Sequence, residues 1–243
     1  MVLKAVLLDF NGVIINDESI HQALIEDLLL EENLRPKPEE FEQVCLGRSD
    51  RACFTELLDR RGRVVTDAYL DKLVDRKTAK YQQALAALDK LPLYAGLDDV
   101  VYQIRVAHLK LAVVSGARRS EIDWVLDRAN IRAYVSVVVS GDDVPTAGSK
   151  PAPDGYQQAI DQLNHQFPDL DLSPAECLAV EDSFAGIEAA QRAQIPVLGV
   201  AHAYPYHMVH RRATWVIDHL YELNLDWLLP YYEAQKQPLP SLG

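Results

Sequence analysis

An aspartate stands at the end of an apolar run near the start of the chain, in the segment VLLDFNGVIINDE (residues 6–18). The run predicts a buried strand, and the glycine at position 12 predicts a turn directly after it. Asp9 therefore lies where an α/β enzyme holds a nucleophile. Two residues further on, where a second carboxylate would serve as general acid and base, the chain has Asn11. An amide cannot act as a general acid or base near neutral pH, so the segment predicts an active site, a weakened active site or a binding pocket.

Two further segments carry groups that suit an anionic ligand. The apolar run LAVVSGA ends at residues 115–117, and GSKPAPDGY places Lys150 shortly before a predicted helix. Ser115 and the backbone N–H groups of Gly116 and Ala117 could hold a phosphate at a helix N-terminus. Lys150 could balance the negative charges of that phosphate and of the Asp9 carboxylate.

A pair of adjacent acids follows another apolar run, in LAVEDSFAGIEAA. Glu181 and Asp182 would lie at the same edge of a parallel sheet as Asp9, because the carboxyl ends of parallel strands face one crevice. Carboxylate oxygens suit Mg²⁺, and a divalent cation would let an anionic carboxylate approach an anionic phosphate. The sequence therefore predicts a magnesium site beside the candidate nucleophile.

The elements that must position these groups alternate along the chain. Continuously apolar runs predict strands that are buried on both faces of a parallel sheet. The segments between them have helical length and spacing, which predicts a doubly wound, Rossmann-like α/β sheet with right-handed crossovers. The predicted strands are residues 5–8, 111–114, 135–139, 178–180, 197–200 and 215–217, and the predicted helices are residues 97–108, 121–130, 154–167 and 185–193.

One region breaks this alternation. Between residues 18 and 89 the sequence has amphipathic helical patterns and no convincing buried strand. The patterns cover residues 20–32, 51–61 and 68–88, and they predict a helical bundle inserted after the first strand. We expect a core of residues 1–16 and 92–243 and a helical cap of residues 17–91. The cap would form a lid over the carboxyl end of the first strand.

Taken together, these motifs resemble the haloacid dehalogenase (HAD) superfamily, and the inserted helices resemble the cap of its β-phosphoglucomutase and phosphoglycolate phosphatase branch. The segments KPAPDGYQQA and VEDSFAGIEAA are highly specific to that branch. The resemblance implies an aspartyl-phosphate intermediate on the nucleophile. It implies the following site: Asp9 as nucleophile, Ser115 and Lys150 as phosphate binders, and Mg²⁺ held by Asp9, the backbone carbonyl of Asn11 and Asp182, with Glu181 nearby.

The same resemblance assigns roles within the cap. The segment LGRSDRACF resembles a substrate-specificity loop, in which Arg48 and Arg51 could meet the far end of a substrate. His21 and Lys77 fall where related mutases place residues that help to handle the sugar phosphate. The departure from the pattern is Asn11, because the family has aspartate there. Loss of acid–base help typically costs roughly 10²- to 10⁴-fold in rate.

The sequence therefore predicts an HAD-like phosphatase or phosphomutase that uses Mg²⁺ and acts on a small phosphorylated metabolite such as a sugar phosphate. Asn11 should weaken its activity. The alternative is a catalytically silent HAD fold that binds a phosphorylated ligand or a partner. The dehalogenase and phosphonatase branches also lack the second aspartate, and they stay minor alternatives.

Composition limits the partners. The net charge of −12 argues against a surface that binds nucleic acid or anionic membranes. No apolar segment approaches the roughly 20 residues that span a bilayer. Three cysteines without metal-like spacing suggest reduced structural thiols in a cytoplasmic protein, which we expect to be a monomer or weak dimer. The proline-rich C-terminal segment QKQPLPSLG is predicted to be mobile.

Overall fold

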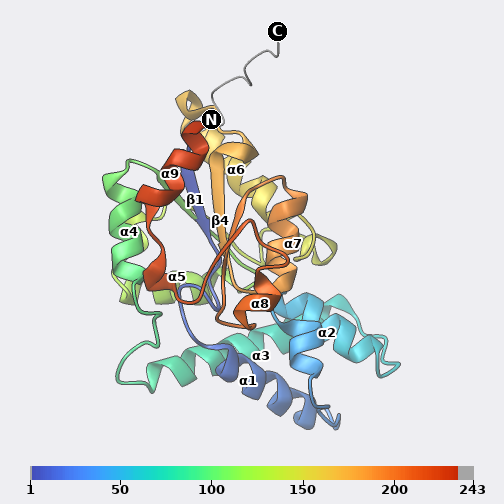
Figure 1. The fold of residues 1–243 in the computed structure, drawn as a ribbon. Coiled ribbons are helices and arrows are strands. Elements are labelled where there is room, and N and C mark those ends of the chain that lie inside the picture. Colours follow the sequence, from blue (N-terminus) through green and yellow to red (C-terminus); the bar gives the residue numbers. More distant parts are fainter. Residues whose placement is uncertain (1, 235–243) are drawn as a thin grey trace.

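The structure of the protein is a computed structural model, in which residues 2–234 are described (Figure 1). Within these residues the strands form one parallel sheet in the order β3-β2-β1-β4-β5-β6. The first strand lies in the middle, where Leu8 pairs with Val113 on one side and with Val180 on the other. The predicted α/β fold class is confirmed. The strands are β1 (Ala5–Leu8), β2 (Lys110–Val114), β3 (Val137–Val139), β4 (Cys177–Glu181), β5 (Val197–Val200) and β6 (Trp215–Ile217).

Helices cover both faces of this sheet, and each face has its own hydrophobic cluster. Leu97 and Leu228 pack on one face, and Tyr156 and Ile187 pack on the other. The strand side chains are continuously apolar because both faces are covered. The helices are α4 (Leu97–Val106), α5 (Arg119–Arg128), α6 (Asp154–Gln166), α7 (Phe184–Arg192), α8 (Tyr206–Val209) and α9 (Leu225–Ala234).

A separate helical unit, the cap, lies beyond the carboxyl ends of the strands (Figure 1). It has its own buried cluster, which includes Leu28, Phe54 and Leu73. The two chain segments that join it to the core run side by side, because Asn16 N donates to Pro92 O at 2.8 Å. The exact domain bounds at residues 17 and 91 stay a prediction. The cap comprises α1 (Glu18–Glu31), the π-helix η1 (Phe41–Cys45), α2 (Asp50–Asp59) and α3 (Asp67–Ala86).

The cysteines require a correction. Cys45 and Cys53 form a disulfide between η1 and α2, with their Cα atoms 4.7 Å apart, whereas Cys177 is free and buried. The prediction of three reduced thiols is therefore wrong for the first two. A turn between the two helices brings these residues together, which their spacing in the sequence does not reveal.

Two remaining expectations concern membrane-spanning segments and the C-terminal segment. Among residues 2–234, every helix is too short or too polar to cross a lipid bilayer. The segment QKQPLPSLG, predicted to be mobile, lies outside the described residues.

Candidate active site

The end of β1 places Asp9 in a buried ionic cluster. The Asp9 backbone N–H donates to Val180 O at 3.0 Å, which holds the residue at the strand edge. Lys150 Nζ lies 2.8 Å from Asp9 Oδ1 and 2.5 Å from Glu181 Oε1. Burial and the charge of Glu181 raise the pKa of Asp9 to about 7, although Lys150 opposes the shift. The buried lysine stays charged, because the two carboxylates outweigh the effect of burial and raise its pKa above the ordinary value.

Glu181 is fully buried and is held from several sides. Besides the lysine contact, it accepts a hydrogen bond of 2.6 Å from Tyr156 Oη. Lys150 also donates to the backbone carbonyl of Val114 at 3.0 Å. Together with the contact between Lys150 and Asp9, these contacts join the ends of β1, β2 and β4 to the start of α6, so four separate motifs of the sequence meet at one point.

Asp9, Glu181 and Asp182 form the one group of three or more potential metal-ligating side chains within residues 2–234, with one carboxylate oxygen of each within 4.8 Å of the others. Asp182 Oδ2 is buried and has no hydrogen-bond partner among the described residues. Burial and the neighbouring acids, Glu18 first, raise the pKa of Asp182 well above its ordinary value. An orphaned carboxylate oxygen in a set of hard oxygen donors fits Mg²⁺.

Gly12 is required for this arrangement. Its φ of +80° is a left-handed conformation, and a Cβ added there would fall 1.9 Å from Asp182 Oδ2. The Gly12 carbonyl accepts a hydrogen bond of 2.7 Å from His202 Nδ1. The turn after β1 can therefore pass close to the acidic cluster only with glycine at this position.

The predicted phosphate-binding residues lie beside Asp9, at the end of β2. Ser115 is buried, and its hydroxyl accepts a hydrogen bond of 3.0 Å from Ala117 N. Gly116 faces the cap closely, since a Cβ added to it would fall 2.6 Å from Ser49 N. Ser49 N itself donates to Ser149 Oγ on the core at 2.9 Å. The cap loop is thus seated directly on the strand ends.

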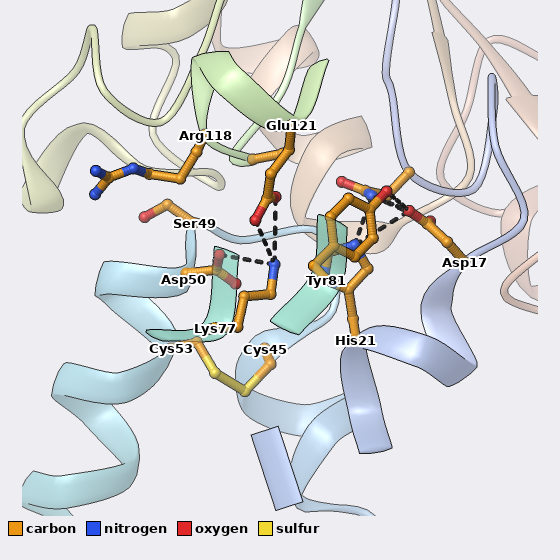
Figure 2. A network of polar contacts seen from close by, with 12 residues as sticks. Asp17, His21, Cys45, Ser49, Asp50, Cys53, Lys77, Tyr81, Arg118 and Glu121 are labelled. Atoms are coloured by element: carbon orange, nitrogen blue, oxygen red, sulfur yellow. Dashed lines mark hydrogen bonds and ion pairs between the residues drawn. A yellow bond between two sulfur atoms is a disulfide. The ribbon is translucent and has the colours of Figure 1, made fainter. Parts of the chain in front are cut away.

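Asn11 takes part in a network that sequence reasoning did not anticipate. Its amide Nδ2 donates to Asp17 Oδ1 and Oδ2 at 3.1 and 3.0 Å and lies 2.9 Å from His21 Nε2. Tyr81 Oη also donates to Asp17, and the tyrosine ring stacks on His21 (Figure 2). Burial alone would raise the pKa of Asp17, but the charge and hydrogen bond of His21, with those of Tyr81 and Asn11, bring it below the ordinary value. The sequence shows Asp17 only as one acid next to another.

The core and the cap enclose a pocket above these groups. Glu18 lines it, and burial together with Asp17 raises the pKa of this carboxyl to about 7. All but one of the predicted site residues line the pocket or lie in the ionic cluster below it, and the exception is Arg51. The predicted lining residues are Asp9, Asn11, His21, Arg48, Lys77, Ser115, Gly116, Ala117 and Asp182. The other two are in contact with one another below it: Lys150 and Glu181.

Arg51 alone among the predicted cap residues points elsewhere. Its guanidinium pairs with Asp67 at 2.7 Å and with Asp71, both on α3. Within residues 2–234 it is absent from the pocket lining. Arg48 lines the pocket, and its Nη1 pairs with Glu56 and donates to a backbone carbonyl within the cap.

Lys77 is fully buried between the cap and the core (Figure 2). Its ammonium lies 2.8 Å from Asp50 Oδ2 on α2 and 3.3 Å from Glu121 Oε2 on α5. Burial by itself lowers the pKa of Lys77, but Asp50 and Glu121 outweigh it and raise the pKa. Neither acid was singled out from the sequence, because both look like ordinary first-turn acids of surface helices.

The fold and the site define a class: a capped α/β enzyme with an aspartate at the end of its first strand. The chain matches the family model of the haloacid dehalogenase-like hydrolases over residues 3–194. It belongs to that family, and its relatives place it among the phosphatase and phosphomutase enzymes. A β-phosphoglucomutase of Bacillus subtilis is 28% identical over 84% of this chain and 85% of its own. Protein CbbY of Rhodobacter capsulatus is 25% identical over 90% of this chain and 95% of its own.

Solved structures show the same fold. A β-phosphoglucomutase of Clostridium difficile superposes with a TM-score of 0.82 at 16% identity, covering 96% of this chain and 98% of the other. A CbbY variant from Rhodobacter sphaeroides, solved in complex with xylulose-1,5-bisphosphate, gives a TM-score of 0.77 at 22% identity, covering 92% and 97%. The predicted superfamily and branch are confirmed.

Proposed function

We propose that the protein transfers the phosphoryl group of a small phosphorylated metabolite, such as a sugar phosphate, to Asp9, as a phosphatase or phosphomutase that depends on Mg²⁺. The observation that carries this proposal is the buried cluster in which Lys150 contacts both Asp9 and Glu181, at 2.8 and 2.5 Å. A lysine held in this way favours the ionised form of Asp9, against the effect of burial, and lowers the repulsion between Asp9 and an incoming phosphate.

The chemistry follows from these positions. An oxygen of Asp9 attacks phosphorus, the bond from phosphorus to the ester oxygen breaks, and that oxygen leaves as an alkoxide that takes a proton from solvent. Ser115 and the neighbouring backbone N–H groups would hold the phosphate oxygens during this step. Asp9, Asp182 and the Asn11 carbonyl would hold Mg²⁺, with Glu181 nearby; when bound, the ion adds positive charge that offsets the negative charges of carboxylate and phosphate.

Proton transfer is the weak part of this site. The leaving alkoxide needs a proton, and the attacking water of the second step must lose one. Asn11 can neither give the first proton nor accept the second, and its amide N–H groups donate to Asp17. The lack of an acid–base group at position 11 favours slow turnover of alkyl phosphates. The same lack favours a second candidate function, in which the fold binds a phosphorylated ligand or a partner without turning over a substrate.

Phosphate release from a panel of phosphomonoesters with Mg²⁺ tests the proposal, with Asp9→Asn as the matched control. We expect release that stops with a chelator and in the variant, and a phosphorylated Asp9 peptide in wild-type digests. Release that persists unchanged in Asp9→Asn would exclude the mechanism. Tight binding of a phosphate ester without any release would favour the binding function.

A further inference from the structure

The pocket contains buried charges that the chemistry at Asp9 does not use. Lys77 and Asp50 both line the pocket together with Asp9. The lysine side chain and that of Glu121 are fully buried, and the Asp50 side chain is 12% exposed. Three elements from two parts of the fold therefore converge on one cation and two carboxylates, as Figure 2 shows.

The other pocket cation is also neutralised. Arg48 is paired with Glu56, which in turn pairs with Arg60 on the cap surface. Arg48 Nε is buried and, within residues 2–234, without a hydrogen-bond partner. A hydroxyl oxygen of a ligand could accept from it. Each of the two pocket cations, Lys77 and Arg48, is therefore already paired with a carboxylate of the protein.

We infer that the part of the pocket beside Lys77 selects a substrate whose non-phosphate end is uncharged or cationic, and that Asp50 and Glu121 act together to reject a second phosphate. The inference deepens the proposed function and rests on it in one respect, because the reacting phosphate is taken to lie at Asp9. To hold a second phosphate, Lys77 would have to leave at least one carboxylate buried and unpaired, which is strongly unfavourable. Like charges brought together in a partly buried site also disfavour binding.

A choice between the two proposed reactions follows. In a mutase, the phosphoryl group on Asp9 moves to a second hydroxyl of the substrate, so the pocket must accept a bisphosphate. In a phosphatase, water attacks phosphorus, the bond from phosphorus to the Asp9 oxygen breaks, and inorganic phosphate leaves with the proton passing to solvent. The charges around Lys77 favour hydrolysis.

The test is a charge series of sugar phosphates bound to the Asp9→Asn protein with Mg²⁺, measured by calorimetry. The probes are glucosamine phosphate and glucose phosphate, each esterified at the primary hydroxyl, and glucose bisphosphate, with a second phosphate at the anomeric position. We expect the bisphosphate to bind roughly tenfold or more weakly than the glucose monophosphate, and the amino sugar to bind at least as tightly as glucose phosphate. A bisphosphate that binds equally or more tightly would overturn the inference, and so would absence of binding by all three probes.

Asp50→Asn, added to the same protein, should reduce the penalty against the bisphosphate by about tenfold. Asp71→Asn, which removes a partner of Arg51 outside the pocket, is the matched control and should leave the ratio unchanged. A folded Asp50→Asn protein with an unchanged ratio would overturn the assignment. If that variant does not fold, the probe series in the parent protein still decides. Phosphate release by the wild type is measured separately, so failure of turnover with the expected order of affinities counts against the proposed function alone.

Discussion

Replacing Asn11 by aspartate would restore a carboxyl group at the acid–base position and place it against another carboxylate. The Asn11 amide nitrogen lies 3.0 Å from Asp17 Oδ2 and 3.1 Å from Oδ1. Two unit charges about 3 Å apart repel by roughly 5–6 kcal/mol at an effective dielectric constant near 20, or about four pKa units as an upper bound. Since Tyr81 and His21 help to keep the pKa of Asp17 low, the new carboxyl group should hold the proton. A protonated acid is the form that a leaving alkoxide needs.

We therefore expect Asn11→Asp to raise the rate of hydrolysis of sugar phosphates by roughly 10²- to 10⁴-fold. Aryl phosphates leave without protonation, so p-nitrophenyl phosphate should gain much less. Initial rates of release from the two ester types measure this difference. Peptide mass analysis must accompany the rates, because the wild-type Asn11-Gly12 pair can deamidate and mimic the variant.

The same variant should be less stable, and the sign of its pH dependence follows from the raised pKa. A carboxyl group with a raised pKa in the folded state stabilises the protein at low pH and loses this contribution as pH rises. The deficit relative to wild type should therefore be larger at about pH 8 than at about pH 5 in urea unfolding. Asn11→Asp combined with Asp17→Asn exchanges the amide and the carboxylate and should recover the lost stability. Equal rate changes on alkyl and aryl esters, or no change on either, would refute the role of position 11 in proton transfer.

Three other outcomes are expected. Arg48→Ala should raise KM for a sugar phosphate, because Arg48 lines the pocket. Arg51→Ala should leave KM unchanged and alter the free energy of unfolding by about 1 kcal/mol or less, because the ion pairs of Arg51 lie on the cap surface. Equal effects of the two variants on KM would contradict this assignment. Reduction of the Cys45–Cys53 disulfide, which spans a sequence separation of 8, should lower the free energy of unfolding by roughly 2–3 kcal/mol, and an unchanged urea midpoint would argue against the bond. Because burial and Glu181 raise the pKa of Asp9 to about 7, the metal-free protein should lose stability from this group as pH rises through that value. Mg²⁺ should then raise the melting temperature more at about pH 8 than at about pH 6, and the opposite order would be inconsistent with a metal site there.

The sheet and its catalytic edge were predictable because they depend on local pattern. Runs of apolar residues mark the strands, and a polar residue directly after each run marks the crevice, which is why Asp9, Ser115 and Asp182 could be found from the sequence. Small errors remained at the boundaries. The strand predicted from residue 135 begins at Val137, because the preceding residues form a 3₁₀ turn, Arg132–Tyr134.

The pairings across the cap were not predictable by the same means. Lys77 looks like a free substrate ligand until the fold brings Asp50 and Glu121 to it, from positions 27 residues before and 44 residues after it in the chain. The Cys45–Cys53 disulfide depends likewise on the angle at which η1 meets α2. Such contacts carry no periodic signal, because each needs only one residue of suitable charge or chemistry at one position of a helix.

Asn11 and Asp17 illustrate why a departure from a motif should be interpreted together with its neighbours in space. Considered alone, the amide at position 11 means only that the carboxyl group for acid–base catalysis is missing. In the structure it is also the hydrogen-bond donor to a fully buried carboxylate, and that carboxylate also accepts from Tyr81. Carboxyl groups at both positions would require a shared proton, whereas the amide at position 11 donates to the ionised Asp17 without having to titrate. The two residues therefore form one unit, in which acid–base capacity at position 11 is exchanged for a stable contact between the catalytic turn and the first helix of the cap.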